Sequence, residues 1–268
     1  MSPQGRPKGE YRSAEHEGAP VGFSGISLRR HGAIGILRLE RAASGNSLSA
    51  AMVQQIDAAI DTCSGDGTQA VLLEGDGRHF CTGFDLSDLD SETDDSLLAR
   101  FVRVELMLQK WYRAPFITAA LAHGKTWGAG ADLFAASSMR WARPDATFAF
   151  PGAAFGLVLG SARLAALTGA GAATDWISSG RPVGAEEAHR HALLQSAPEA
   201  LDTAQAVARL QTMVDRLDTV TLAQIRSATQ TRSAADDAID LDRLVRSAAR
   251  PGVKERISRY RAAMRAGK

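Results

Sequence analysis

The sequence predicts an α/β protein with parallel strand pairs, followed by a helical last third. Two observations lead to this prediction. Short apolar runs alternate with segments of helical periodicity over roughly the first 180 residues, and the sequence is helical in character from about residue 185 onward. With 45% hydrophobic and 23% charged residues, the 268-residue chain can bury the core of one large domain.

The first predicted strand is the β-branched and leucine-rich run at residues 33–40. The helix after it has Ser49 as its expected N-cap, and apolar residues recur along it at spacings of four, three and four. These residues are Met52, Ile56, Ala59 and Cys63. The next strand, residues 70–74, is a short apolar run of the kind that is buried on both faces.

A second helix repeats this spacing and is expected to end before Pro115. Its apolar positions are Leu97, Phe101, Val104 and Leu108. A buried strand at 116–122, a helix that starts near residue 128 and short strands at 139–142 and 147–150 follow. Near the C-terminus a further helical stripe comprises Val253, Ile257, Tyr260 and Met264. This apolar stripe is expected to need a partner.

Charge and cysteine content restrict the class of protein. The 31 basic and 30 acidic residues balance, so neither nucleic acid nor a membrane surface is expected as a partner. Two cysteines are too few for a disulfide framework and, together with the lack of a signal peptide or a run of about 18 apolar residues, indicate a soluble cytoplasmic protein. No cluster has metal-ligand spacing. Residues 1–22 are polar and rich in glycine, proline and charge, which predicts a mobile tail.

Two glycine-rich turns, at residues 75–85 and 123–132, each follow a predicted buried strand. The second is no phosphate-binding loop, because Ala119 stands where a glycine is required, and no dinucleotide fingerprint, because Leu133 replaces a small residue. In one interpretation the glycines only form turns, and Asp132 only complements a helix dipole. In the other, the two turns aim backbone N–H groups at one point and form an oxyanion hole.

The sequence VLLEGDGRHFCTGFDLSDL (71–89) resembles the first signature of the crotonase superfamily, the enoyl-CoA hydratase/isomerase group, and residues 116–157 resemble the second. GNSLSAAM (45–52) and residues 177–194 are also similar to segments of that family, and the resemblance runs from about residue 26 to about 200. It implies a spiral of ββα repeats over 23–200 and a helical region over 201–268 that assembles a homotrimer or a dimer of trimers. It also implies an acyl-CoA thioester as substrate, with no cofactor beyond the coenzyme A of that substrate.

The resemblance places the two oxyanion-hole N–H groups on Phe84 and Ala129. Asp132 takes the position of one catalytic glutamate, and Gly152, after Pro151, takes the position of the other, so a second acid is missing. The bulky Phe84 is expected to reshape the acyl pocket without removing its backbone donor. The implied substrate-binding residues are Ser47, Cys81, Gly83, Asp85, Leu86, Trp127, Gly128, Gly130, Pro151 and Gly152.

The remaining ionisable residues are expected to be structural. His79 and His123 are interpreted as packed or capping histidines, Asp85 as a cap of nearby N–H groups, and Cys81 as a small buried residue. Glu105 is interpreted either as reaching the pocket or as part of a solvated helix face.

The predicted function is that of an acyl-CoA-processing enzyme that stabilises a thioester enolate. Because hydration across a double bond needs one group to activate water and another to handle the proton, isomerisation or another enolate reaction ranks at least level with hydration. Decarboxylation, retro-Claisen cleavage and thioester hydrolysis are the other enolate reactions considered. The alternative is a catalytically degenerate protein of the same fold that binds an acyl-CoA or a protein partner without turnover.

Overall fold

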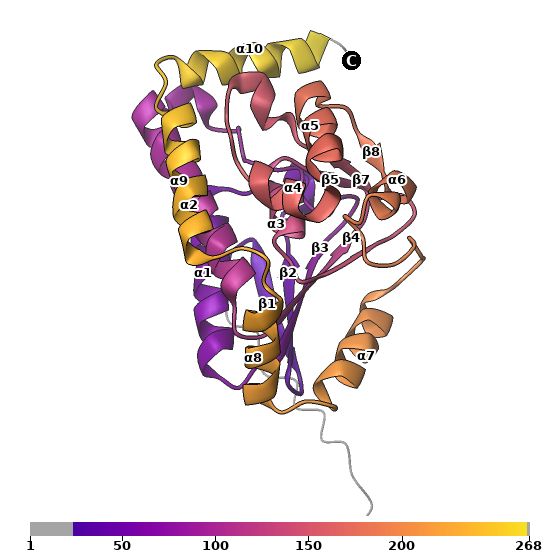
Figure 1. Ribbon diagram of the computed structural model, residues 1–268. Helices are drawn as coiled ribbons and strands as arrows, with labels where there is room; N and C mark the ends of the chain where they lie inside the picture. The colour runs from indigo at the N-terminus through magenta and orange to yellow at the C-terminus, as the bar shows by residue number, and fades with distance from the viewer. Residues whose placement is uncertain (1–23, 267–268) are drawn as a thin grey trace, which may run out of the picture.

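The computed structural model describes residues 24–266, which form a five-stranded and a three-stranded sheet with helices packed around them (Figure 1). The strands of the larger sheet, in spatial order, are β1 (Ile26–His31), β2 (Ile34–Leu39), β3 (Ala70–Gly75), β4 (Ile117–Ala122) and β6 (Met139–Ala142). Only β1 and β2 are antiparallel; the other pairs are parallel. The prediction of parallel pairs is therefore confirmed.

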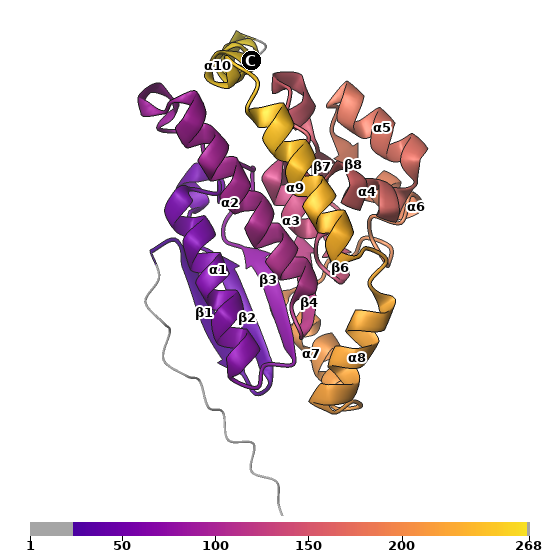
Figure 2. The same ribbon diagram turned by 60° about the vertical axis from the view of Figure 1, so that its left-hand side comes forward.

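Both central strands, β3 and β4, are buried along their whole length, as their apolar runs predicted. One face of the sheet packs against α1 (Ala50–Gly65), α2 (Asp94–Arg113) and α3 (Ala129–Ala135). The opposite face packs against α7 (Thr203–Val214) and one leucine of α8 (Thr219–Thr229). Figure 2 shows α1, α2 and α9 (Ala234–Ala248) side by side in one layer. Each central strand thus has helices on both sides, which explains the absence of polar alternation.

Local sequence signals set the ends of the first two helices. The Ser49 side chain accepts a hydrogen bond from the Met52 N–H, as predicted for an N-cap. Thr93 and Ser96 form a reciprocal capping box at the start of α2, and the helix ends at Arg113. The predicted apolar stripes of both helices are buried.

The smaller sheet consists of β5 (Lys125–Trp127), β7 (Thr147–Ala149) and β8 (Val183–Gly184). Strands β1, β5 and β8 were not predicted; β5 and β8, with three and two residues, are too short to show a period-two pattern. Helices α4 (Ser161–Thr168) and α5 (Ala170–Ser179), separated only by Gly169, were also missed. The remaining elements are α6 (Ala185–Arg190), η1 (Ala42–Ser44), η2 (Leu89–Ser91) and η3 (Pro151–Phe155).

The last helix, α10 (Val253–Ala266), crosses one end of the molecule and packs over η3 and α2 (Figure 1). Val253 and Ile257 are fully buried against the same chain, whereas Met264 remains 45% exposed. The expectation that this stripe needs a partner subunit is therefore wrong for its buried half, because the chain covers those residues itself.

The helical character of the last third is confirmed, and the division of the chain at residue 200 stays a prediction. The predicted tail, residues 1–22, lies outside the described residues. Within residues 24–266, no helix combines the length and the apolar character that crossing a bilayer requires.

Candidate active site

The two glycine-rich turns lie against each other at one end of the larger sheet. Gly83 has φ 100° and Gly128 has φ 53°, conformations that strongly favour glycine. A Cβ atom on Gly83 would lie 2.8 Å from the Trp127 carbonyl oxygen and 3.4 Å from the Ala129 nitrogen. Glycine is therefore needed at position 83 both for the turn and for the close approach of the second segment.

Within the described part of the chain, the backbone N–H groups of Phe84 and Ala129 are both free at this junction. On either side of Phe84, the Leu48 N–H donates to the Gly83 carbonyl at 2.8 Å, and the Asp85 N–H donates to the Leu48 carbonyl at 3.1 Å. Ala129 is the first residue of α3, where backbone N–H groups have no partner within the helix. Among residues 24–266, neither N–H has a hydrogen-bond partner, and both residues line the same cavity.

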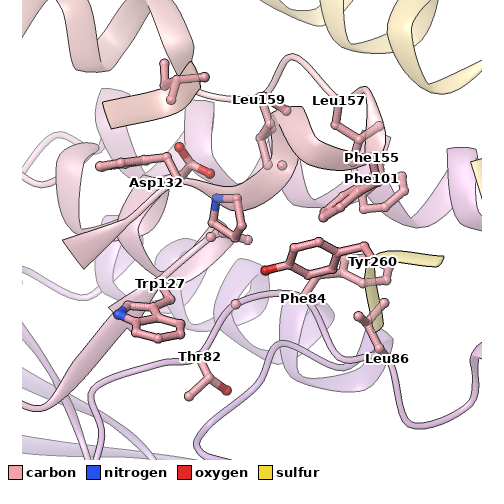
Figure 3. Close-up of a pocket in the computed structure, with 18 of the residues that line it drawn as sticks. Thr82, Phe84, Leu86, Phe101, Trp127, Asp132, Phe155, Leu157, Leu159 and Tyr260 are labelled. Atoms are coloured by element: carbon pink, nitrogen blue, oxygen red, sulfur yellow. The ribbon is translucent and has the colours of Figure 1, made fainter. Parts of the chain in front are cut away.

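This cavity has a volume of about 260 Å³ and mostly apolar walls (Figure 3). Its aromatic residues are Phe84, Phe101, Trp127, Phe150, Phe155 and Tyr260. Among the described lining residues, the ionisable ones are Asp132, Tyr260 and Arg261. Such a cavity fits an apolar chain that carries one polar reacting group.

Asp132 is the carboxylate of the cavity and comes from α3, where it is 5% exposed. Burial raises the pKa of Asp132 to about 8; the nearby Glu105 carboxylate adds to the rise, and the Arg163 guanidinium opposes it. Gly160 packs directly on the carboxylate, because a Cβ atom there would lie 2.0 Å from Oδ1 of Asp132. At neutral pH the group is therefore mainly protonated, and it can give or take a proton near pH 8.

Glu105 neither reaches the cavity nor faces solvent, so both interpretations of this residue are wrong. Its side chain is 1% exposed and accepts two hydrogen bonds from Arg163, at 2.9 Å from Nη1 and 2.6 Å from Nη2. The two residues are 58 positions apart in the sequence. Because α4 brings Arg163 to the side of α2 that carries Glu105, the helix pattern of α2 alone gave no sign of this ion pair.

Most of the predicted site residues do meet at the cavity. Those that line it are Gly83, Phe84, Leu86, Trp127, Gly128, Ala129, Asp132, Pro151 and Gly152. As expected from the sequence, Gly152 brings no ionisable group to the position of the second acid. The described lining of the cavity therefore supplies one carboxylate where two-group hydration would use two.

Four predicted substrate-binding residues, Ser47, Cys81, Asp85 and Gly130, lie outside the cavity lining. They form the support beneath it. Cys81 is fully buried against Gly130. A Cβ atom added at position 130 would lie only 2.5 Å from the Cys81 carbonyl oxygen. Asp85 accepts the Ser87 N–H, as its predicted capping role requires, and is also paired with Arg41 at 2.8 Å. Arg41 in turn donates to the Ser47 carbonyl at 2.6 Å, which holds the Phe84 segment in place.

The two histidines beside the turns have structural contacts, as predicted. His79 Nδ1 accepts the Lys125 N–H at 3.2 Å, and His123 Nε2 lies 3.1 Å from the Gly77 carbonyl oxygen. Burial lowers the pKa of both imidazoles, and neither lines the cavity. Both histidines therefore act as packed, capping residues.

The sequence interpretation missed the wall of the cavity that α10 provides. Tyr260, Arg261 and Met264 line the cavity, and the hydroxyl of Tyr260 points toward its interior (Figure 3). The helical stripe that contains Tyr260 and Met264 was found, but it was assigned to a contact between subunits. Phe101 was likewise identified only as a core position of α2, although its ring faces the cavity.

The sheet, the paired glycine turns and the helical C-terminal region together form the crotonase fold. A solved structure from Bordetella parapertussis, named enoyl-CoA hydratase/isomerase, is 35% identical and superposes with a TM-score of 0.83 over 89% of this chain and 98% of that one. An enoyl-CoA hydratase/isomerase structure from Xanthobacter autotrophicus, 22% identical, shares the fold with a TM-score of 0.80 over 92% of this chain and 95% of its own.

The chain belongs to the Enoyl-CoA hydratase/isomerase family, whose family model matches residues 29–255. A Mycobacterium tuberculosis relative named as a probable enoyl-CoA hydratase is 30% identical over 165 residues, which are 60% of this chain and 65% of that relative. An ethylmalonyl-CoA decarboxylase from Gallus gallus is 29% identical over 62% of this chain and 58% of its own length. The chain thus spans just under two thirds of the mycobacterial relative that it matches.

Proposed function

We propose that the protein is an acyl-CoA enzyme that stabilises a thioester enolate with the backbone N–H groups of Phe84 and Ala129. The observation that supports this proposal is that two backbone donors, unpaired within residues 24–266, line one apolar cavity together with a buried carboxylate. Donors that are fixed in place before reaction stabilise a developing oxyanion strongly, because they need no reorganisation in a site with little water.

Asp132 is the proposed proton-transfer group. A shift of a carbon–carbon double bond along an acyl chain needs one base: the carboxylate removes a proton, the electron pair moves into the thioester to give the enolate, and the same proton returns to another carbon. Hydration needs a second group to activate water, and Gly152 supplies none. Double-bond isomerisation is therefore the reaction that this site favours.

Decarboxylation is a second candidate, favoured by the raised pKa of Asp132. When the carboxylate of a malonyl-type thioester leaves as carbon dioxide, its bonding electrons form the enolate, and a protonated Asp132 can then deliver a proton to the α-carbon. No base is required. The relative named ethylmalonyl-CoA decarboxylase adds support to this candidate.

The two reactions predict opposite dependence of kcat/KM on pH, which gives the decisive experiment. Isomerisation uses ionised Asp132, so kcat/KM should rise about tenfold per pH unit and level off above about pH 8. Decarboxylation uses protonated Asp132, so kcat/KM should be level at low pH and fall above about pH 8.

The assay should offer enoyl-CoA thioesters with the double bond at different positions and α-carboxylated acyl-CoA thioesters, and follow isomer formation and carbon dioxide release. Turnover of either class by the mechanism above supports the proposal. Binding of acyl-CoA without turnover of any member would overturn it and favour the degenerate, binding-only alternative. Hydration of a 2-enoyl-CoA at a rate comparable to that of isomerisation or decarboxylation would show that Asp132 alone both takes the proton from water and delivers a proton to the α-carbon.

A further inference from the structure

A second cavity of about 270 Å³ lies where α2 and α3 end, and it shares no lining residue with the candidate active site. Four arginines line it: Arg140, Arg163, Arg226 and Arg232. Among the described residues, no aspartate or glutamate lines this cavity. Four guanidinium groups around one small cavity create a positive potential that needs an explanation.

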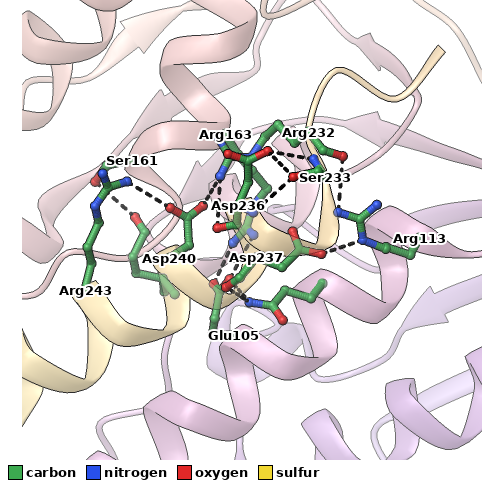
Figure 4. Close-up of polar contacts among 12 residues, drawn as sticks. Glu105, Arg113, Ser161, Arg163, Arg232, Ser233, Asp236, Asp237, Asp240 and Arg243 are labelled. Carbon is green, nitrogen blue, oxygen red and sulfur yellow. Dashed lines mark hydrogen bonds and ion pairs between the residues drawn. The ribbon is translucent and has the colours of Figure 1, made fainter. Parts of the chain in front are cut away.

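Two of the four arginines are neutralised by carboxylates that lie behind them. Arg163 pairs with Glu105 and Arg232 pairs with Asp240 (Figure 4). The N···O distance is 2.6 Å in each pair. Even so, the Nε atoms of Arg163 and Arg232 are buried and have no hydrogen-bond partner within the described part of the chain. These two Nε donors are therefore unused within residues 24–266, although their burial keeps them from contact with the cavity.

The other two arginines have no carboxylate partner among residues 24–266. Arg140 and Arg226 are 7% and 8% exposed, so both residues are largely withdrawn from water. Arg140 donates to the carbonyls of Leu193 and Ser137, at 2.9 and 2.7 Å. Its Nη2 makes no hydrogen bond to the described chain. A buried cation without an anion is unfavourable, because desolvation is not repaid by an ion pair.

Arg226 is held in the same way, with carbonyl oxygens as its only described partners. It donates to Ala114 and Tyr112, both at 3.1 Å, and its Nη1 is unused. Burial lowers the pKa of both Arg140 and Arg226 to about 10, which is the direction expected for cations that lack a counterion.

The partial negative charges of helix C-termini offset only part of the positive charge of Arg140 and Arg226. The carbonyls that accept from Arg226 lie at the C-terminus of α2, and one that accepts from Arg140 lies just beyond the C-terminus of α3. Each helix C-terminus carries roughly half a negative charge, so two helix ends offset about one of the two unpaired positive charges. About one positive charge remains to be balanced inside the cavity.

We infer that this cavity binds a small inorganic oxyanion of the size of phosphate or sulfate. Guanidinium groups present planar sets of N–H donors that match the oxygens of such anions, and the unused donors of Arg140 and Arg226 are available to them. The inference is independent of the chemistry proposed for the first cavity.

The test is calorimetric titration of inorganic phosphate into the full chain, with chloride holding the ionic strength constant. We expect saturable binding of one phosphate per chain. Arg140→Gln and Arg226→Gln should each weaken the affinity by about tenfold or more, since each removes a charge-assisted donor. Arg246→Gln is the matched control: Arg246 is 79% exposed on α9, and this variant should bind like the parent.

Lack of saturable binding by the parent chain, or equal affinity in the parent and both cavity variants, would overturn the inference. If the glutamine variants do not fold, Arg140→Lys and Arg226→Lys keep the charge but lose the planar donor set, and should still weaken binding. A crystal soaked in selenate gives a readout that needs no variant. An anomalous peak beside Arg140 and Arg226 supports the inference, whereas a carboxylate of a neighbouring subunit in that position overturns it.

Discussion

Asp132 lies where two physical effects act in opposite directions. Its place in the first turn of α3 favours the anion, an effect worth roughly 0.3–1 kcal/mol. Burial favours the neutral acid and can raise a carboxyl pKa by up to about 3–5 units. Because the pKa of Asp132 is raised to about 8, desolvation outweighs the helix dipole.

Replacing Asp132 with asparagine should remove proton transfer without disturbing the cavity. Asparagine has almost the same shape, and it removes a carboxylate that is costly to bury when ionised. We expect Asp132→Asn to retain the fold and acyl-CoA binding and to lose roughly 10²-fold or more in kcat, the usual scale of general acid–base catalysis. Parent-level turnover would mean that Asp132 only complements the dipole of α3 and that the proton moves through another group.

Phe84 should control which acyl chains fit, because its ring lines the cavity while its backbone N–H is the proposed donor. The ring packs on Phe101 with a centroid distance of 4.4 Å and lies 4.2 Å from the Arg100 guanidinium carbon. Phe84→Ala should enlarge the cavity, shift the preference toward longer or branched acyl-CoA thioesters and lower stability by about 1–3 kcal/mol.

The measurement for Phe84→Ala is kcat/KM across a series of acyl chain lengths. Phe80→Leu is a suitable control, because Phe80 is fully buried against Phe134 and does not line the cavity. The control should lose stability and keep the parent profile. An unchanged profile in Phe84→Ala would show that the ring does not contact the substrate.

At the scale of single elements, Gly128 fixes the direction of the Ala129 N–H. It caps α3 with φ 53° and ψ −131°, a region almost restricted to glycine, yet a Cβ atom there would meet no atom closer than 3.7 Å. Gly128→Ala therefore strains the backbone without a steric clash. We expect it to cost about 1–3 kcal/mol in stability and, if it turns the Ala129 N–H away, about 10²–10³-fold in kcat.

Gly171→Ala provides the comparison for this prediction. Gly171 lies in α5 with open space around it and has an ordinary backbone conformation, so alanine should be neutral or stabilise by up to about 1 kcal/mol. Thermal unfolding and kcat should be measured for both variants. Parent-like activity in Gly128→Ala would remove Ala129 from the proposed oxyanion hole.

The sequence predicted those elements whose signals are local. A continuous apolar run identifies β3, a hydroxyl before a helix identifies the Ser49 cap, and the glycines of the two turns lack a Cβ atom where backbones meet. Contacts between segments far apart in the sequence could not be predicted, because no local pattern indicates them. The Glu105–Arg163 ion pair joins two helices far apart in the chain, and neither helix alone indicates the other.

For α10, too, the sequence predicted the helix but not what it contacts. The apolar spacing correctly gave a helical face, but spacing does not indicate whether that face contacts its own chain, a ligand or another subunit. In the structure Val253 and Ile257 pack into the core, and Tyr260 lines the cavity. Only the three-dimensional arrangement separates these contacts.

At the scale of the whole molecule, assembly remains a prediction that follows from the family resemblance. We predict a homotrimer or a dimer of trimers, so light scattering at micromolar concentration should give three or six times the 28.4 kDa mass of one chain. A stable monomer would contradict this. Large aliphatic residues that stay exposed in one chain, and are available to such an interface, include Leu106, Val220, Ile225 and Ile239.

The role of α10 in assembly can be tested separately from assembly itself. Because Ile257 is fully buried within its own chain, Ile257→Ala should leave a cavity and lower the free energy of unfolding by about 2–5 kcal/mol. The same substitution should leave the mass of the assembly unchanged at temperatures where the variant stays folded. If the mass instead falls to that of one chain while the fold persists, α10 also contacts a neighbouring subunit, and its apolar stripe has both roles.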